Sequence, residues 1–213
     1  DGLVLPALGL AALDHRTGRL DEDQIARIKA TMDELREITA DNRGIANGHH
    51  GPAIVEAKRI LVVAARGAID QEAAHFVASL LRRQHGCAIY ETSASSGLTA
   101  LAAARDVMRE HNPDAVLIVT VGGIEPSQLS FVAKRARREF PLQEMLVLDF
   151  QTTGMARAGE SSASDGGYVT LRSVTEVLER SGCQRSQTQD RQVPADGGAS
   201  SNREAVLVRT ALA

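Results

Sequence analysis

The region from residue 59 to residue 150 alternates short apolar runs with amphipathic segments, and this alternation constrains the fold most strongly. Apolar, β-branched runs occupy residues 59–65, Ala115–Val121 and residues 145–150, and a shorter, half-polar run occupies Cys87–Glu91. The segments between these runs have helical spacing of their apolar residues. Near-continuous apolar strands that alternate with helices are typical of a parallel sheet covered on both faces. We therefore predict a doubly wound α/β sheet and expect any ligand at the carboxyl ends of its strands.

Composition limits both the core and the partners of the chain. Of its 213 residues, 43% are hydrophobic but only 3% are aromatic, and Trp is absent. The core must therefore consist of Ala, Val, Leu and Ile. A net charge of −3 argues against nucleic-acid binding as the main role. No apolar run in the sequence reaches the roughly 18 residues that a membrane-spanning helix requires.

The two cysteines, Cys87 and Cys183, do not form a Cys-x-x-Cys motif. Isolated cysteines of this kind are typical of proteins in a reducing compartment. We therefore expect two free thiols and no disulfide.

The segments that flank the strand–helix units complete the predicted organisation. A short helix is expected from about Pro6, and a longer amphipathic helix from Asp21, with acidic residues in its first turn. A fifth strand is expected at residues 168–171, followed by a last helix, Val174–Ser181, capped by Ser173. The predicted parts of the chain are a helical pair, a Gly/Asn-rich linker, an α/β domain and a low-complexity tail, at residues 1–40, 41–57, 58–182 and 183–213.

Two loops at the expected carboxyl edge hold the candidate ligand-binding residues. The first loop leads into a helix amino terminus, where backbone N–H groups attract anions, and Arg66 adds a guanidinium that can bind a carboxylate or phosphate. The same loop also fits an ordinary strand-to-helix turn in which Asp70 caps the helix. The glycine pair after the third strand allows close backbone approach but equally fits a simple turn. The candidates are Arg66, Gly67, Asp70, Thr120, Gly122 and Gly123.

Motifs for catalysis, metals and cofactors are missing from the sequence. There is no Gly-x-Ser-x-Gly elbow, no Gly-x-Gly-x-x-Gly fingerprint and no P-loop. His49-His50 has no second pair of ligands at metal spacing. The acidic residues with which phospho-acceptor receiver domains hold Mg²⁺ are absent after the first and third strands. We therefore predict a non-catalytic protein without a metal or cofactor.

A basic run at residues 134–138 follows the third strand on the expected third helix. Such a run is most often a solvated helix face. It also fits a surface that faces anionic lipid or an acidic partner.

A helical pair followed by a flavodoxin-like α/β unit resembles cobalamin-binding domains in architecture. Those domains have Asp-x-His-x-x-Gly after the first strand, Ser-x-Leu after the third and Gly-Gly after the fourth. The corresponding stretches here, residues 67–71, 119–121 and 149–153, lack all three motifs. The resemblance therefore implies the fold and not the cobalamin site.

The chain more closely resembles the soluble carboxy-terminal region of some bacterial permeases of the autoinducer-2 exporter family. The likeness lies in the opening Leu-Val-Leu-Pro-Ala-Leu-Gly-Leu-Ala, the acidic helix start Leu-Asp-Glu, the Ile-Leu-Val-Val strand with its Asp-x-x-Ala helix, and the basic segment that ends in Glu-Phe-Pro. These matches lie at residues 3–11, 20–22, 60–73 and 132–141, so the likeness covers about residues 1 to 150.

This resemblance implies a membrane-embedded transporter segment before Asp1 and a cytoplasmic domain tethered to the inner membrane. We expect a non-catalytic regulatory or interaction domain that senses a small ligand at the carboxyl edge of the sheet, with no nucleic-acid partner. A homo-oligomer through the helical pair is also expected. The alternatives are a degenerate cobalamin- or nucleotide-binding regulatory domain and a small-molecule enzyme of unknown class.

Overall fold

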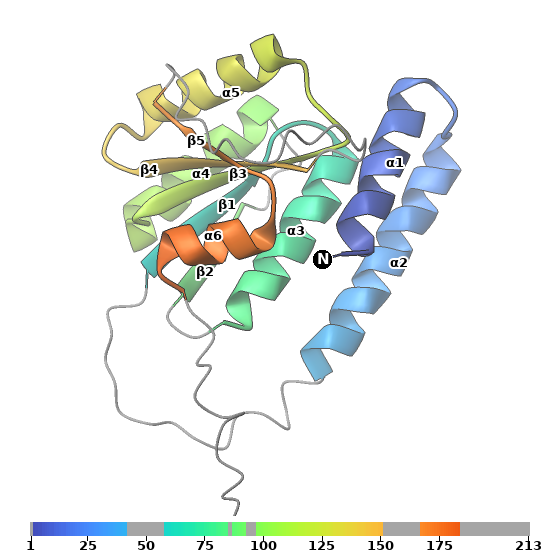
Figure 1. Cartoon of the computed structure of the whole chain (residues 1–213), viewed down its shortest axis with the longest axis horizontal. Coiled ribbons are helices and arrows are strands. Elements are labelled where there is room, and N and C mark those ends of the chain that lie inside the picture. Colours follow the sequence, from blue (N-terminus) through green and yellow to red (C-terminus); the bar gives the residue numbers. More distant parts are fainter. Residues whose placement is uncertain (1, 42–57, 85–86, 93–96, 151–166, 184–213) are drawn as a thin grey trace, which may run out of the picture.

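A five-stranded, all-parallel sheet forms the centre of the molecule (Figure 1). The structure is a computed structural model that describes residues 2–41, 58–84, 87–92, 97–150 and 167–183. Neighbouring strands are parallel throughout, in the order β2-β1-β3-β4-β5. The strands are β1 (Lys58–Ala64), β2 (Cys87–Glu91), β3 (Ala115–Val121), β4 (Glu144–Phe150) and β5 (Val169–Leu171). The predicted doubly wound, flavodoxin-like α/β fold is confirmed.

The central strands are the most apolar because helices cover both of their faces. Every residue of β3 is buried, whereas every residue of the edge strand β2 is only partly buried. This difference confirms the prediction that β2 lies at an edge. Helices α3 (Ala68–Arg82) and α6 (Val174–Ser181) pack on one face, and α4 (Gly97–His111) and α5 (Pro126–Glu139) pack on the other. The predicted cap of α6 is confirmed, since the Glu176 N–H donates to Ser173 Oγ at 3.1 Å.

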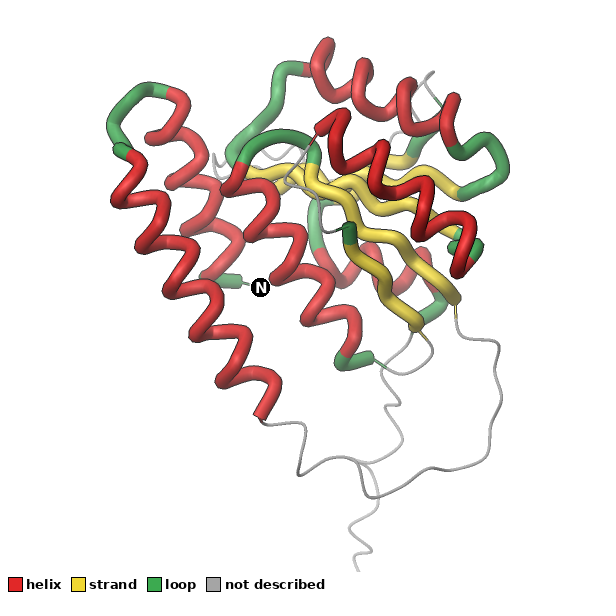
Figure 2. The backbone as a smooth tube through the Cα atoms, turned by 180° about the vertical axis from the view of Figure 1, so that it is seen from behind, coloured by secondary structure: helices red, strands yellow, loops and turns green. Residues whose placement is uncertain are grey.

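The amino-terminal helices, α1 (Val4–Arg16) and α2 (Glu22–Asp41), pack beside α3, as Figure 2 shows from behind. A capping box starts α2: the Gln24 N–H donates to the Asp21 carboxylate at 2.7 Å, and the Asp21 N–H donates to Gln24 Oε1 at 2.9 Å. Leu5, Leu8 and Ala12 of α1 are buried in the same core as α3 and α6. The helical pair therefore covers part of the sheet and shares its core.

An ion pair fastens α2 to α3. Arg36 Nη2 lies 3.2 Å from a carboxylate oxygen of Glu72, whose side chain is only 6% exposed. Burial raises the pKa of Glu72, and the charge of Arg36 opposes this rise without cancelling it. The Glu72 carboxylate has little access to water, and the Arg36 guanidinium lies beside it. Helix α2 is therefore held on α3 by charge as well as by apolar contact.

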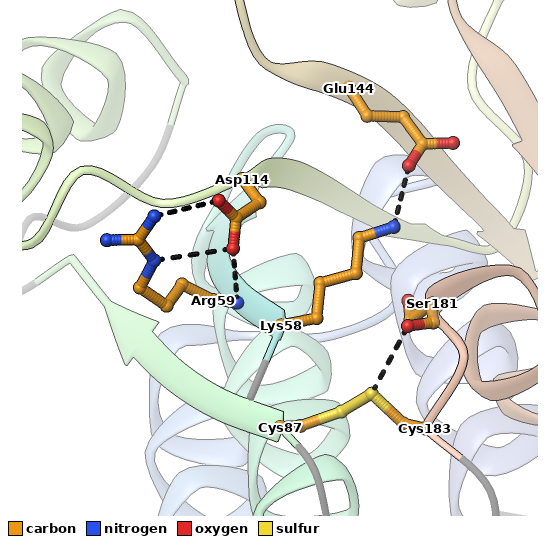
Figure 3. Close-up of a disulfide and its surroundings, with 7 residues drawn as sticks. All are labelled: Lys58, Arg59, Cys87, Asp114, Glu144, Ser181 and Cys183. Atoms are coloured by element: carbon orange, nitrogen blue, oxygen red, sulfur yellow. Dashed lines mark hydrogen bonds and ion pairs between the residues drawn. A yellow bond between two sulfur atoms is a disulfide. The ribbon is translucent and has the colours of Figure 1, made fainter. Parts of the chain in front are cut away.

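The amino edge of the sheet is closed by ion pairs (Figure 3). The Arg59 guanidinium lies 2.9 Å from Asp114 and lowers the pKa of that carboxyl through its hydrogen bonds. Lys58 lies 2.8 Å from Glu144, which Arg180 of α6 also contacts at 2.9 Å. These charges therefore have partners within the chain at this edge.

Cys87 and Cys183 form a disulfide, with their Cα atoms 6.0 Å apart (Figure 3). The expectation of two free thiols is therefore wrong, and the inference of a reducing compartment loses its premise. The reason is topological. Helix α6 starts from β5 at one edge of the sheet and packs against α3, so Cys183 at its end reaches the start of β2 at the opposite edge.

Within the described residues, no helix is both long enough and apolar enough to span a bilayer. The predicted linker beyond residue 41 and the predicted tail beyond residue 183 lie outside the described residues.

Reduction of the disulfide should lower the free energy of unfolding by about 2–5 kcal/mol, because the bond closes a loop between cysteines 96 residues apart. The measurement is urea denaturation with and without dithiothreitol. The Cys87→Ala variant is the control, since dithiothreitol should not change its stability further. Equal stability of the oxidised and reduced wild type would contradict this role of the bond.

Candidate functional site

Arg66 and Asp70 form a hydrogen-bonded cluster with β3 at the carboxyl edge of the sheet. Arg66 Nε lies 3.2 Å from the Asp70 carboxylate, and its Nη2 donates to the carbonyl of Val121 at 3.3 Å. Thr120 Oγ1 lies 3.4 Å from both the Asp70 carboxylate and Arg66 Nη2. The chain turns in opposite directions after β1 and β3, so this cluster marks the switch point at which doubly wound sheets bind ligands.

Asp70 does not cap α3, contrary to the prediction. The helix begins at Ala68, Gly67 is its N-cap, and no side chain caps it. The Asp70 carboxylate instead crosses to β3 and accepts the Val121 N–H at 3.0 Å. A residue in the first turn can face the sheet when the helix packs directly on it, and the sequence pattern does not distinguish this geometry from a cap.

Burial raises the pKa of Asp70, whose residue is only 3% exposed. This pKa is lowered by the Val121 N–H, by the charge of Arg66 and by the hydrogen bonds to Arg66 and Thr120. Together these effects do not offset the effect of burial. Because the folded pKa lies above the ordinary value, Asp70 contributes stability at low pH that is lost as the pH rises through the folded pKa.

Helix α1 closes over the end of β3 through an unusually close backbone contact. Gly122 has φ +72°, and a Cβ atom placed on it would lie 2.6 Å from the Gly9 carbonyl oxygen and 3.0 Å from Ala12 Cβ. From the end of α1, the Arg16 guanidinium donates to the carbonyls of both Gly122 and Gly123. Of the two roles that the sequence left open for the glycine pair, close backbone approach occurs at Gly122, and the backbone that approaches is that of α1.

A small cavity of about 160 Å³ lies between the end of α1 and the start of α3, and we call it the switch-point crevice. Two guanidinium groups and the uncapped amino terminus of α3 face the same space, so the crevice favours an anion. The residues that line it are Ala12, His15, Arg16, Arg66, Gly67, Ala68, Ile69 and Asp70.

The candidate residues from the sequence divide into three groups in space. Arg66, Gly67 and Asp70 line the switch-point crevice, and Thr120 contacts two of them from the end of β3. The carbonyls of Gly122 and Gly123 are bonded to Arg16. All six therefore lie around one edge of the sheet, but the glycine pair holds α1 in place.

Sequence reasoning missed His15 and Arg16, which contribute the α1 side of the crevice. Arg16 lies 106 positions before Gly122, and no local pattern marks their contact. His49-His50 lies outside the described residues. Among the residues that the structure does describe, no group of three or more His, Cys, Asp or Glu side chains is arranged to hold a metal ion.

No known protein-family model matches the chain, and no curated protein matches it.

The Gly122→Ala variant should be less stable than Gly123→Ala by about 1–3 kcal/mol. Both glycines have a positive φ, +72° and +71°, so both variants bear the same backbone cost, but only a Cβ on Gly122 collides with α1. Urea denaturation of the two variants measures the difference. Equal free energies of unfolding would mean that α1 does not pack against Gly122 in solution.

Proposed function

We propose that this chain is a non-catalytic sensor domain that binds a small anion, a carboxylate or a phosphate, in the switch-point crevice. Occupancy of the crevice would be passed to α1, which forms one of its walls, and through α1 to α2. The observation on which the proposal rests is the convergence of Arg16, Arg66 and the uncapped start of α3 on one cavity.

The charges around the crevice support an anionic ligand. Arg66 already contacts the Asp70 carboxylate, so one negative charge is present beside it. Arg16 contacts only backbone carbonyls of Gly122 and Gly123 and the carbonyl of Ala12 among the described residues, so its positive charge has no carboxylate there. An anion that bridges the two guanidinium groups would therefore add the missing negative charge.

The size of the crevice favours a small ligand over the alternatives. Sites for drug-sized ligands and cofactors usually occupy about 300–1,000 Å³. The crevice offers about 160 Å³, which suits an anion of a few heavy atoms better than a cobalamin or a dinucleotide.

The described residues that line the crevice include no Ser, Thr, Cys or Tyr, so this wall supplies none of the usual hydroxyl or thiol nucleophiles.

We further propose that the domain regulates a membrane transporter and is tethered to the inner membrane on its cytoplasmic side. This part of the proposal rests on the resemblance of residues 1 to 150 to the soluble region of autoinducer-2 exporter permeases. The helical pair would couple the crevice to the transporter. It also offers a surface for a second copy of the chain, since Leu10 and Leu13 of α1 and its N-cap residue Leu3 are exposed.

The disulfide bears on this proposed location. A cytoplasmic domain would hold Cys87 and Cys183 as thiols for most of its life, whereas an oxidising compartment would preserve the bond. Alkylation of the protein at the moment of cell lysis, followed by mass spectrometry, tests the location: free thiols would support the cytoplasmic proposal, and an intact disulfide would contradict it.

Isothermal titration with sulfate, phosphate and small dicarboxylates tests the anion site. The wild type should bind at least one of these anions, and Arg66→Gln should weaken that binding about tenfold or more, because a charged hydrogen-bond partner is lost. Arg27→Gln is the matched control. Arg27 is an exposed arginine of α2 that lies outside the crevice, so its loss should leave binding unchanged.

Absence of binding for all of these anions would contradict the sensor proposal. So would equal losses in the Arg66→Gln and Arg27→Gln variants, because the effect would then come from overall charge. Circular dichroism of each variant confirms that the fold is retained before titration.

Sulfate affinity should rise as the pH falls through the raised pKa of Asp70, because protonation removes the negative charge beside Arg66. Sulfate keeps both charges over this range, so the effect belongs to the protein. Asp70→Asn should bind sulfate more tightly than the wild type above that pKa and should lose this increase. Both proteins are compared in a His15→Asn background, so that no imidazole lines the crevice. A pH dependence that Asp70→Asn leaves unchanged would rule out this role of Asp70.

A further inference from the structure

The outward face of α5 combines one exposed aromatic residue with a row of cations. The exposed residues recur at intervals of three and four, which places them on one side of the helix. The opposite side is buried against β4 and the sheet, at Leu129, Ala133 and Ala136. Arg137 is also exposed, but it donates to the Gln143 carbonyl at 2.7 Å. We call the surface formed by Phe131, Lys134, Arg135 and Arg138 the α5 face.

The α5 face keeps a positive charge in a protein whose net charge is −3. Arg135 lies 3.3 Å from Glu139, but Arg105 of α4 contacts the same carboxylate at 2.6 Å. Within the described residues, Lys134 and Arg138 have no carboxylate at ion-pair distance. The local charge is therefore not neutralised by the chain and is complementary to an acidic partner.

A groove of about 460 Å³ adjoins this face at the amino-terminal end of α5. Phe131 forms one wall and is 59% exposed, whereas Ile124 is only 7% exposed. The groove therefore has apolar walls at one end of a row of cations. Its lining residues are Arg66, Ile124, Ser127, Gln128, Phe131 and Val132.

We propose that the α5 face and its groove dock an acidic peptide segment of a partner protein. An apolar side chain of the peptide occupies the groove against Phe131, and carboxylates pair with Lys134, Arg135 and Arg138. A concave groove in line with the cations fits a peptide side chain better than it fits a flat lipid surface.

The length of the face specifies the peptide. Arg138 lies seven positions after Phe131, which is about 10 Å of helix rise. An extended peptide covers that distance in about three residues. The predicted motif is therefore one large apolar residue with two or more acidic residues within about three positions of it on one side.

This surface is separate from the switch-point crevice and does not depend on the anion proposal. The two share a single residue, Arg66, which lines both cavities. The variants that test the α5 face leave Arg66 in place, so failure of one proposal is distinguishable from failure of the other.

Fluorescence anisotropy with a pool of fluorescein-labelled acidic dodecapeptides tests the docking surface. Each peptide holds one Leu or Phe, placed at every position in turn, among Glu and Ser residues. The whole chain should bind peptides with the predicted motif, and binding should weaken as salt is added. Phe131→Ala should weaken binding about tenfold, since buried aromatic side chains dominate such interfaces.

Charge is tested separately from the aromatic residue. A triple variant with Gln at Lys134, Arg135 and Arg138 should weaken binding about tenfold or more. The matched control replaces three exposed arginines elsewhere with Gln, at Arg27, Arg83 and Arg172, and should bind as the wild type does. Because all of these positions are exposed, the variants should fold.

Three outcomes would overturn the proposal. One is that no acidic peptide binds, or that peptides with Lys in place of Glu bind equally well. A second is that Phe131→Ala and the triple variant bind as tightly as the wild type. The third is that the protein binds vesicles of phosphatidylserine and phosphatidylcholine but none of the peptides, which would assign the α5 face to a membrane.

Discussion

The contact between Gly122 at the end of β3 and Gly9 of α1 determines how the amino-terminal helices sit on the sheet. No side chain fits between these two backbones, because a Cβ on Gly122 would lie 2.6 Å from the Gly9 carbonyl oxygen. Once the backbones meet, Leu5 and Leu8 of α1 are buried in the core shared with α3. Arg16 then reaches the carbonyls beyond β3. Gly122 therefore allows α1, which lies outside the α/β unit, to pack against the carboxyl edge of the sheet and to line the crevice there.

That placement explains why the site is electropositive although the protein is not. The α/β unit alone contributes Arg66 and the amino terminus of α3, and the buried Asp70 carboxylate partly balances them. Helix α1 adds Arg16 and His15 on the other side of the same space. The crevice is thus lined by two parts of the chain, the end of α1 and the start of α3. A ligand that bridges the two sides alters the equilibrium only by binding one arrangement more tightly than another.

Much of the fold was predictable from local patterns. The apolar runs of β1, β3 and β4, the half-polar edge strand β2 and the Ser173 cap of α6 all follow from residue type and spacing, because burial on two faces demands continuous apolar strands. The capping box at the start of α2 also depends on residues three apart. These features are local, so the sequence alone is sufficient to predict them.

The errors concern contacts between distant residues. Cys87 and Cys183 are 96 positions apart, and only the return of α6 across the α3 face brings them together. Asp70 has the residue type and position of a helix cap, but packing of α3 on the sheet directs its carboxylate to Val121. Arg16 was missed because the pairing of α1 with the end of β3 has no sequence signature. Of the residues that line the crevice, those on the α3 side were therefore predictable from the sequence, and those on the α1 side were not.

Hydrogen exchange of the backbone amides of α1, with and without saturating sulfate, tests the central claim most directly. If α1 closes on the occupied crevice, exchange in its last two turns should slow with sulfate, while α4 on the opposite face should not change. In the Gly122→Ala variant the response of α1 should disappear, because the collision with Gly9 separates the helix from the sheet. Exchange in α1 that is the same with and without bound sulfate would contradict the account, since the crevice would then have no connection to the helical pair.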